Sequence, residues 1–76
     1  MNKERKARLQ DVVSMLEDAL DELEDIQSEE QDAFDNLSDS AQSSEKGEAM
    51  ESYIDAMDNG IAKIESAISC VRSIGK

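Results

Sequence analysis

The side chains of this chain that could do chemistry are mostly carboxylates. Its 76 residues include 19 Asp and Glu but no His, which excludes Ser-His and Cys-His nucleophile systems and the usual zinc ligand sets. A carboxylate that acts as a general acid needs a dry pocket, whereas most of these recur on the polar side of a helical pattern. We therefore expect no catalytic residue, no metal ligand and no cofactor, and predict that the protein is not an enzyme.

Three features invite a more specific interpretation. The acid-rich stretch that starts at Asp35 fails as an EF-hand, because Lys46 stands where the bidentate Glu belongs. Glu30 interrupts an apolar helical column, where we expect it to set the packing register, with a metal-ligand or catalytic role as the alternative. The single Cys70 excludes an internal disulfide and is interpreted as a half-buried structural thiol.

The elements that would position these side chains are two long helices. Apolar residues recur in alternating steps of three and four, which predicts a helix over 3–34 and a second over 45–74. In the first segment the a and d positions are Leu9, Val12, Leu16, Ala19, Leu23, Ile26, Glu30, Ala33 and Leu37, with Val13, Leu20, Gln27 and Phe34 in an adjoining column. In the second they are Gly47, Met50, Ile54, Met57, Ile61, Ile64, Ile68 and Val71, with Tyr53, Gly60, Ala67 and Ile74 beside them.

The intervening stretch 35–44 is crowded with Asp, Asn and Ser, which favour turns over a continuing helix. Ser43 or Ser44 is the expected N-cap of the second helix, and Gly75 its expected terminator. Asn59-Gly60 is a turn signal inside that helix, but the register passes through it without a phase change, so we expect one continuous helix.

These patterns predict a single all-α domain over residues 1–76, folded as a helical hairpin of two long antiparallel helices. Each helix carries a wider apolar face than one partner helix covers, so we expect a homo-oligomer, with a dimer that forms an antiparallel four-helix bundle favoured. The expected oligomer core consists of Leu16, Leu20, Leu23, Ile26, Ile54, Met57, Ile61, Ile64 and Ile68.

The net charge of -11 is unevenly distributed. Residues 11–58 carry 17 of the 19 acids and one base, so the turn end of a hairpin would be acidic. The opposite end would be basic, with Lys3, Arg5, Lys6, Arg8, Arg72 and Lys76. These few bases on so acidic a chain do not form a basic surface that could follow a phosphate backbone, and we expect no direct binding of nucleic acid. No segment has the length and apolarity of a membrane span or a signal peptide, so we expect no membrane association and a cytoplasmic location.

The acids of the first helix are dense enough to imitate nucleic acid. Residues 17–35 contain ten acids over roughly 27 Å of helix, and two such rows brought onto one side would carry about one charge per 1.4 Å, against roughly 1.7 Å in duplex DNA. A solvated face that maintains solubility is the alternative. The expected partner-binding acids are Glu17, Asp18, Asp21, Glu22, Glu24, Asp25, Glu29 and Asp32.

The central stretch also resembles a known group of proteins. Residues 28–37, SEEQDAFDNL, and residues 42–48, QSSEKGE, resemble the turn of small, acidic helical-hairpin proteins of bacteriophages and other mobile elements. Members often have Pro after the D-N-[LM] element, where this chain has Ser38. The resemblance implies a phage or mobile-element source, hence the cytoplasm of a bacterial host. It also implies a specific structural or recognition role for the turn residues Phe34, Asp35, Asn36, Leu37 and Gly47; in the structural interpretation, Phe34 and Leu37 plug the bundle end, Asp35 and Asn36 cap, and Gly47 permits close packing.

Together these observations predict a non-enzymatic protein-protein interaction module, a phage-type modulator or inhibitor whose acidic face binds a basic surface of a host protein, including a nucleic-acid-binding or defence protein. One alternative is an oligomeric sponge that captures a small nucleotide signal at the basic end. The other is a purely structural phage protein.

Overall fold

The computed structural model describes residues 1–74, which form helices and connecting turns and no strand. The helices are α1 (Lys3–Asp35), α2 (Asp39–Gln42) and α3 (Glu45–Arg72). The prediction of an all-α chain is confirmed over this range. Gly75 and Lys76, the expected terminator of the second helix and the last cation of the basic end, lie outside the described residues.

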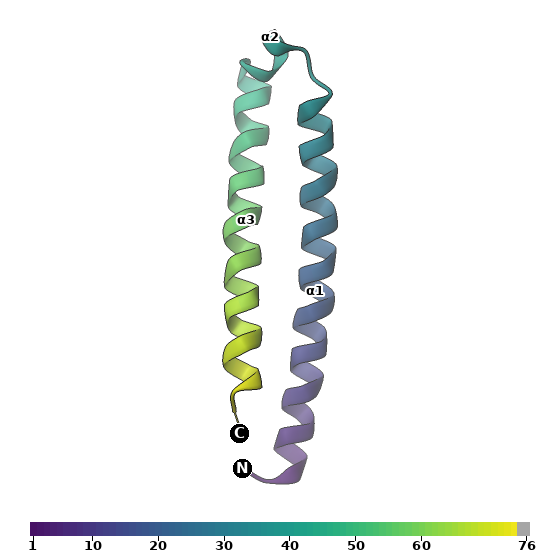
Figure 1. The fold of residues 1–76 in the computed structure, drawn as a ribbon, viewed down its shortest axis with the longest axis vertical. Coiled ribbons are helices and arrows are strands. Elements are labelled where there is room, and N and C mark those ends of the chain that lie inside the picture. The colour runs from purple at the N-terminus through teal and green to yellow at the C-terminus, as the bar shows by residue number, and fades with distance from the viewer. Residues whose placement is uncertain (75–76) are drawn as a thin grey trace.

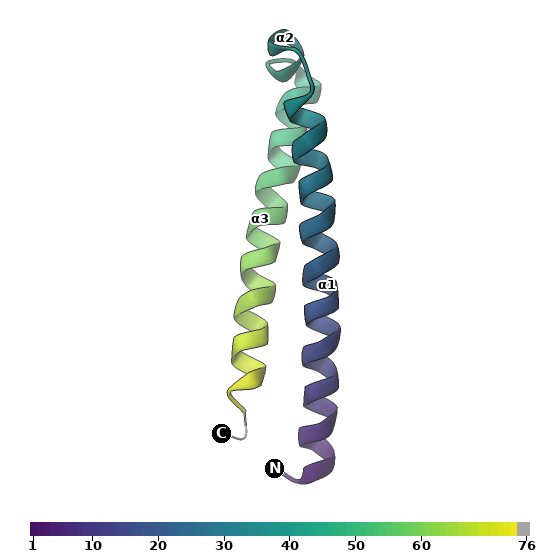
Figure 2. The ribbon, with the colours of Figure 1, turned by 45° about the vertical axis from the view of Figure 1, so that its right-hand side comes forward.

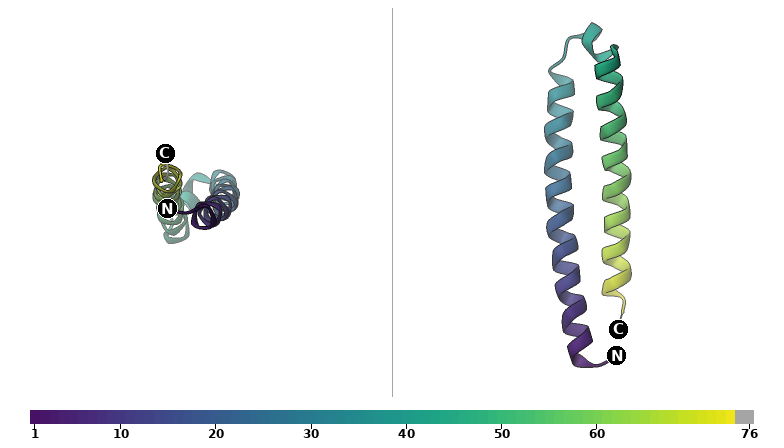
Figure 3. Two further views of the ribbon diagram at one scale, coloured as in Figure 1. Left: turned by 90° about the horizontal axis from the view of Figure 1, so that it is seen from below. Right: turned by 180° about the vertical axis from the view of Figure 1, so that it is seen from behind.

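The two long helices lie side by side and run in opposite directions (Figures 1 and 3). The short helix α2 lies at the end where the chain reverses, and the start of α1 and the end of α3 lie together at the other end (Figure 1). A view turned by 45° shows that α3 is inclined to α1, as in other packed helix pairs (Figure 2). The result is a two-helix rod with extents of 58 × 14 × 14 Å.

Helix α1 does not pack against α3 through the two columns, a and d, that the sequence pattern predicted. The side that makes the contact is rotated around the helix from the predicted one. The seam positions of α1 and of the residues just after it are buried or half-buried and alternate in steps of four and three: Leu9, Val13, Leu16, Leu20, Leu23, Gln27, Glu30, Phe34 and Leu37. Glu17, beside this seam, is also half-buried. The seam therefore uses the column of Val13 and leaves out the column of Val12. Leu20 and Phe34 are larger than Ala19 and Ala33, so this rotation fills the space between the helices with the bulkier column.

Helix α3 packs through the column expected for it. Gly47, Met50, Ile54, Met57, Ile61, Ile64, Ile68 and Val71 are all buried or half-buried. The helix passes through Asn59 and Gly60 without a break, as its unbroken register predicts. A Cβ on Gly60 would lie 3.4 Å from Leu23 Cδ2, an ordinary packing distance, so no close approach requires glycine here.

The connection between the long helices contains structure that the sequence pattern did not predict. Ser38 caps the one-turn helix α2 by accepting from the Ala41 N–H, and Ser44 caps α3 by accepting from the Gly47 N–H at 3.4 Å. Ser44 is thus the N-cap of α3, and Ser43 is the C-cap of α2. The long helices end at Asp35 and at Arg72, one residue after and two residues before the expected ends at 34 and 74.

The interior of one copy is thin. The buried apolar side chains among the described residues are Val13, Met50, Ile54 and Ile68, and none of them is completely enclosed. A chain of this size already buries a smaller fraction of its surface than larger domains do. Since it contains a single Cys, no internal disulfide compensates for the thin interior.

Candidate functional site

The rod has two unlike long sides, which follow from the register of its seam. Arg72 Nη2 on α3 donates to Glu17 Oε2 on α1 at 2.8 Å, and Gln27 on α1 donates to Asp58 on α3. These contacts cross the rod along one side and bring together the helix positions that flank the seam there. The positions that flank the seam on its other edge must then share the opposite side of the rod.

The first of these sides is acidic. We call it the acidic flank, and it consists of Glu17, Asp21, Glu24, Asp32, Glu51, Asp55, Asp58 and Glu65. Three shallow hollows follow one another along it: Glu17, Asp21 and Glu65 line one, Asp32 and Asp58 the next, and Glu51 and Asp55 the third. Both long helices contribute carboxylates to the first two hollows, so the acids form two facing rows.

The structure divides the acids of the first helix that were expected to bind a partner. Glu17, Asp21, Glu24 and Asp32 lie on the acidic flank, as defined above. Asp18 and Asp25 belong to the same outer column of α1 as Asp32, but only Asp32 lines a hollow of the flank; Glu22 and Glu29 lie toward the opposite side of the rod. The α3 acids of the flank were missed, although their spacing beside the Met50 and Ile54 columns was visible in the sequence.

The opposite side of the rod is apolar and mostly solvent-exposed, with Gly60 and Ala67 half-buried beside the seam. We call it the apolar flank: Val12, Ala19, Ile26 and Ala33 from α1, and Tyr53, Gly60, Ala67 and Ile74 from the α3 side. Ile26, Tyr53 and Ile74 are 46%, 59% and 46% exposed. Ile26 was expected in the oligomer core and lies here, outside the seam of one copy. The other expected core residues, Leu16, Leu20, Leu23, Ile54, Met57, Ile61, Ile64 and Ile68, lie in the seam between α1 and α3.

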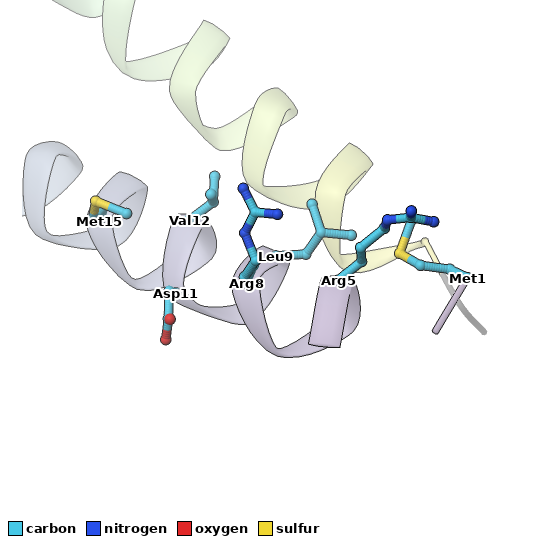
Figure 4. A pocket seen from close by; sticks show the side chains of 7 residues that line it. All are labelled: Met1, Arg5, Arg8, Leu9, Asp11, Val12 and Met15. Atoms are coloured by element: carbon cyan, nitrogen blue, oxygen red, sulfur yellow. The ribbon is translucent and has the colours of Figure 1, made fainter. Parts of the chain in front are cut away.

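The basic end of the rod carries an open hollow of about 450 Å³ that includes Val12, the first residue of the apolar flank (Figure 4). Leu9, Val12 and Met15 supply its apolar surface, and Arg5 and Arg8 stand over it with their guanidinium groups (Figure 4). Met1 and Asp11 complete its lining. The two guanidinium groups outnumber the one carboxylate, so this hollow suits a ligand or surface that is partly apolar and negatively charged.

The turn residues have separable structural roles. Phe34 and Leu37 are half-buried at the end of the seam. Asn36 is the C-cap of α1, and its backbone N–H donates to Asp32 O. Asp35 does not cap a helix as expected; its carboxylate accepts from Gln31 Nε2 at 2.9 Å. Gly47 is buried against α2. The packing is so close that a Cβ at this position would overlap the Gln42 backbone carbonyl.

Two further residues were candidates for chemistry. Glu30 is half-buried in the seam, at a position that suits the register-setting role expected of it. Cys70 is exposed, so the expectation of a half-buried thiol is wrong; it lies just outside the seam column that contains Val71. Within residues 1–74 no group of three or more Cys, Asp or Glu side chains is arranged to hold a metal ion.

Comparisons with protein-family models, curated proteins and solved structures found no match. Over the described part of the chain, no helix combines the length and apolarity that a membrane crossing needs.

Proposed function

We propose that the chain is a helical hairpin that forms a homodimer and acts without catalysis, by binding a basic surface of another protein through its acidic flank. Its role is that of a phage-type modulator or inhibitor of a protein in the bacterial cytoplasm, and a nucleic-acid-binding or defence protein is the expected kind of target. The charge density of the flank favours such a target, because a groove built for phosphates also attracts rows of carboxylates.

The observation that carries this proposal is the pairing of carboxylates from two helices along one side of the rod. Glu65 lies beside Glu17 and Asp21, and Asp58 lies beside Asp32. Arg72 forms an ion pair with Glu17 of this flank, and both side chains are about half exposed. Such a surface costs folding stability through repulsion, so a positively charged partner would relieve it.

The test is capture of proteins from a bacterial lysate by the immobilised chain at low and high salt, with two matched triple variants. In the flank variant Glu51→Gln, Asp55→Asn and Glu65→Gln neutralise three acids of the acidic flank. In the control variant Asp18→Asn, Asp25→Asn and Glu29→Gln remove the same charge from positions of α1 outside the acidic flank. The proposal expects a partner that the wild type and the control retain at low salt and the flank variant loses.

Recovery of no partner at low salt would contradict the proposal. Equal loss in both triple variants would also contradict it, because net charge and not the flank would then govern binding. Circular dichroism of each variant confirms that the helices remain intact.

The hollow at the basic end favours a second candidate function, the capture of a small nucleotide. Arg5 and Arg8 would bind phosphates, and the apolar surface from Leu9 to Met15 would hold the base. Calorimetric titration with cyclic and linear nucleotides tests this function, with Arg5→Gln/Arg8→Gln as the negative control. A flat titration of the wild-type protein would exclude it.

A further inference from the structure

The apolar flank is a surface of the rod that the seam between α1 and α3 does not use. It combines large exposed side chains, such as Ile26 and Tyr53, with small ones, such as Ala19 and Ala33. The interior of one copy is thin, so this flank holds apolar surface whose burial would add substantially to stability.

We propose that a second copy of this chain packs face to face on the apolar flank, with the two rods antiparallel. This inference rests on the dimer of the proposed function and specifies its surface and its orientation. A symmetric dimer uses the same patch on both copies, and an apolar patch satisfies that condition with itself. The flank runs for roughly 32 Å along each helix of a rod that is 14 Å wide, so it forms a continuous strip on which a second rod can lie lengthwise.

The charges beside the flank favour the antiparallel orientation. Arg5 and Arg8 stand over the apolar hollow at the basic end. An antiparallel copy brings its acidic turn end, which includes Asp35 and Asp39, to this end of the rod. A parallel copy would instead bring its own basic end to the same place and double the positive charge there.

The α1 column and the α3 column of the apolar flank have their centres at nearly the same position along the rod. A single twofold axis perpendicular to the rod requires this. The column from Val12 to Ala33 is centred between residues 22 and 23, and the column from Tyr53 to Ile74 between residues 63 and 64. The Glu17–Arg72 and Gln27–Asp58 contacts, whose midpoints are residues 22 and 65, show that these centres are level to within about one helical turn.

A twofold axis at this height places each α1 against α1 of the second copy and each α3 against α3. Val12 then lies opposite Ala33 and Ala19 opposite Ile26, so large and small side chains alternate across the α1 contact. On the other contact, Tyr53 lies opposite Ile74 and Gly60 opposite Ala67. The acidic flanks of the two copies face away from each other, so the dimer presents two identical partner-binding surfaces.

The first experiment changes the flank by one charge. Ile26→Glu places a carboxylate in the proposed interface, and Ser28→Glu adds the same charge two residues along on the acidic side of α1. Sedimentation equilibrium of wild type should show a dimer. Ile26→Glu should weaken the dimer about 100-fold or more, since each dimer would bury two unpaired charges, while Ser28→Glu should leave it within a few-fold.

The second experiment measures orientation and does not depend on a disruptive substitution. In a Cys70→Ser background, a spin label at Lys3→Cys should give a distance of roughly 55–60 Å between copies, from 1.5 Å per residue on either side of the axis. A label at Glu22→Cys, close to the axis, should give a short distance in any dimer and so controls for labelling.

The outcomes separate this inference from the proposed function. A chain that stays monomeric at high concentration overturns both the dimer and this surface. A short distance at Lys3→Cys overturns the antiparallel orientation, and a dimer insensitive to Ile26→Glu overturns the assigned flank, while binding of a basic protein by the acidic flank is unaffected in both cases.

Discussion

Gly47, in the first turn of α3, lies directly against the backbone of Gln42 at the end of α2. A Cβ at this position would overlap the Gln42 carbonyl group and lie 2.7 Å from Ala41 O. Both neighbours are backbone, which cannot rotate away as a flexible side chain can. This contact fixes the direction in which the chain enters α3 and thereby aligns α3 against α1.

Gly47→Ala should therefore destabilise the protein although alanine is the better helix former. We expect a loss of about 1–3 kcal/mol in the free energy of unfolding, from the forced shift of α2. Gly60→Ala is the matched control within one copy, because the nearest side-chain atom leaves room for a Cβ. Measured in dilute solution, where the proposed dimer is dissociated, it should gain up to about 1 kcal/mol from helix propensity. Urea denaturation monitored by circular dichroism measures both, and equal effects of the two substitutions would refute the tight contact at Gly47.

The adjacent serines before α3 should differ in their effect on stability. Ser44→Ala removes the side-chain acceptor for the Gly47 N–H and should cost about 1 kcal/mol. Ser43 Oγ donates only to the carbonyl of Asp39, the first residue of α2, so Ser43→Ala should change stability by less than about 0.5 kcal/mol. Thermal unfolding of the two variants side by side checks the assignment, which a larger loss at Ser43 would reverse.

Gln27 is a polar residue in an otherwise mostly apolar seam. Its Nε2 donates to Ile54 O at 3.3 Å and to the Asp58 carboxylate. Asp58 is exposed, so Gln27→Leu strands no buried charge and adds apolar surface between the helices. We expect a gain of about 1 kcal/mol in the free energy of unfolding, and a loss for Gln27→Ala, measured by denaturant titration. A destabilised Gln27→Leu variant would show that these hydrogen bonds set the register of the seam.

Salt should stabilise the fold. With a net charge of -11 and two facing rows of acids, repulsion outweighs the half-exposed Glu17–Arg72 pair, and added ions screen that repulsion. The thermal midpoint should rise between about 20 mM and about 300 mM NaCl. The flank triple variant described above should show a smaller rise than wild type, and a midpoint that falls with salt would mean that attractive pairs dominate.

The sequence pattern predicted the all-α class and the seam column of α3, but not the side of α1 that meets it. Three apolar columns on α1 have the same periodicity, and periodicity does not say which two of them pack together. Side-chain size does, because Leu20 and Phe34 occupy more volume than Ala19 and Ala33. Helix α2 was missed because four residues are too few to show a helical period, and its Ser38 cap lies among several equivalent serines.

The sequence pattern predicted the α1 acids of the acidic flank but not its α3 acids, for a related reason. The acids of α1 are consecutive enough to stand out, whereas Glu51, Asp58 and Glu65 recur once every seven residues between apolar positions. They become a surface only when the direction of α3 relative to α1 is known. The Glu17–Arg72 contact, which joins residues 55 positions apart, supplies that direction.

The thin interior has a consequence for how this protein would behave as its amount in a cell changes. If pairing supplies the missing burial, folding gains free energy with concentration, and the unfolding temperature rises as the protein accumulates. Scarce chains would spend more time open and would be degraded sooner, whereas abundant chains would protect one another. Folded protein would therefore accumulate only when its concentration exceeds a threshold set by its own association constant.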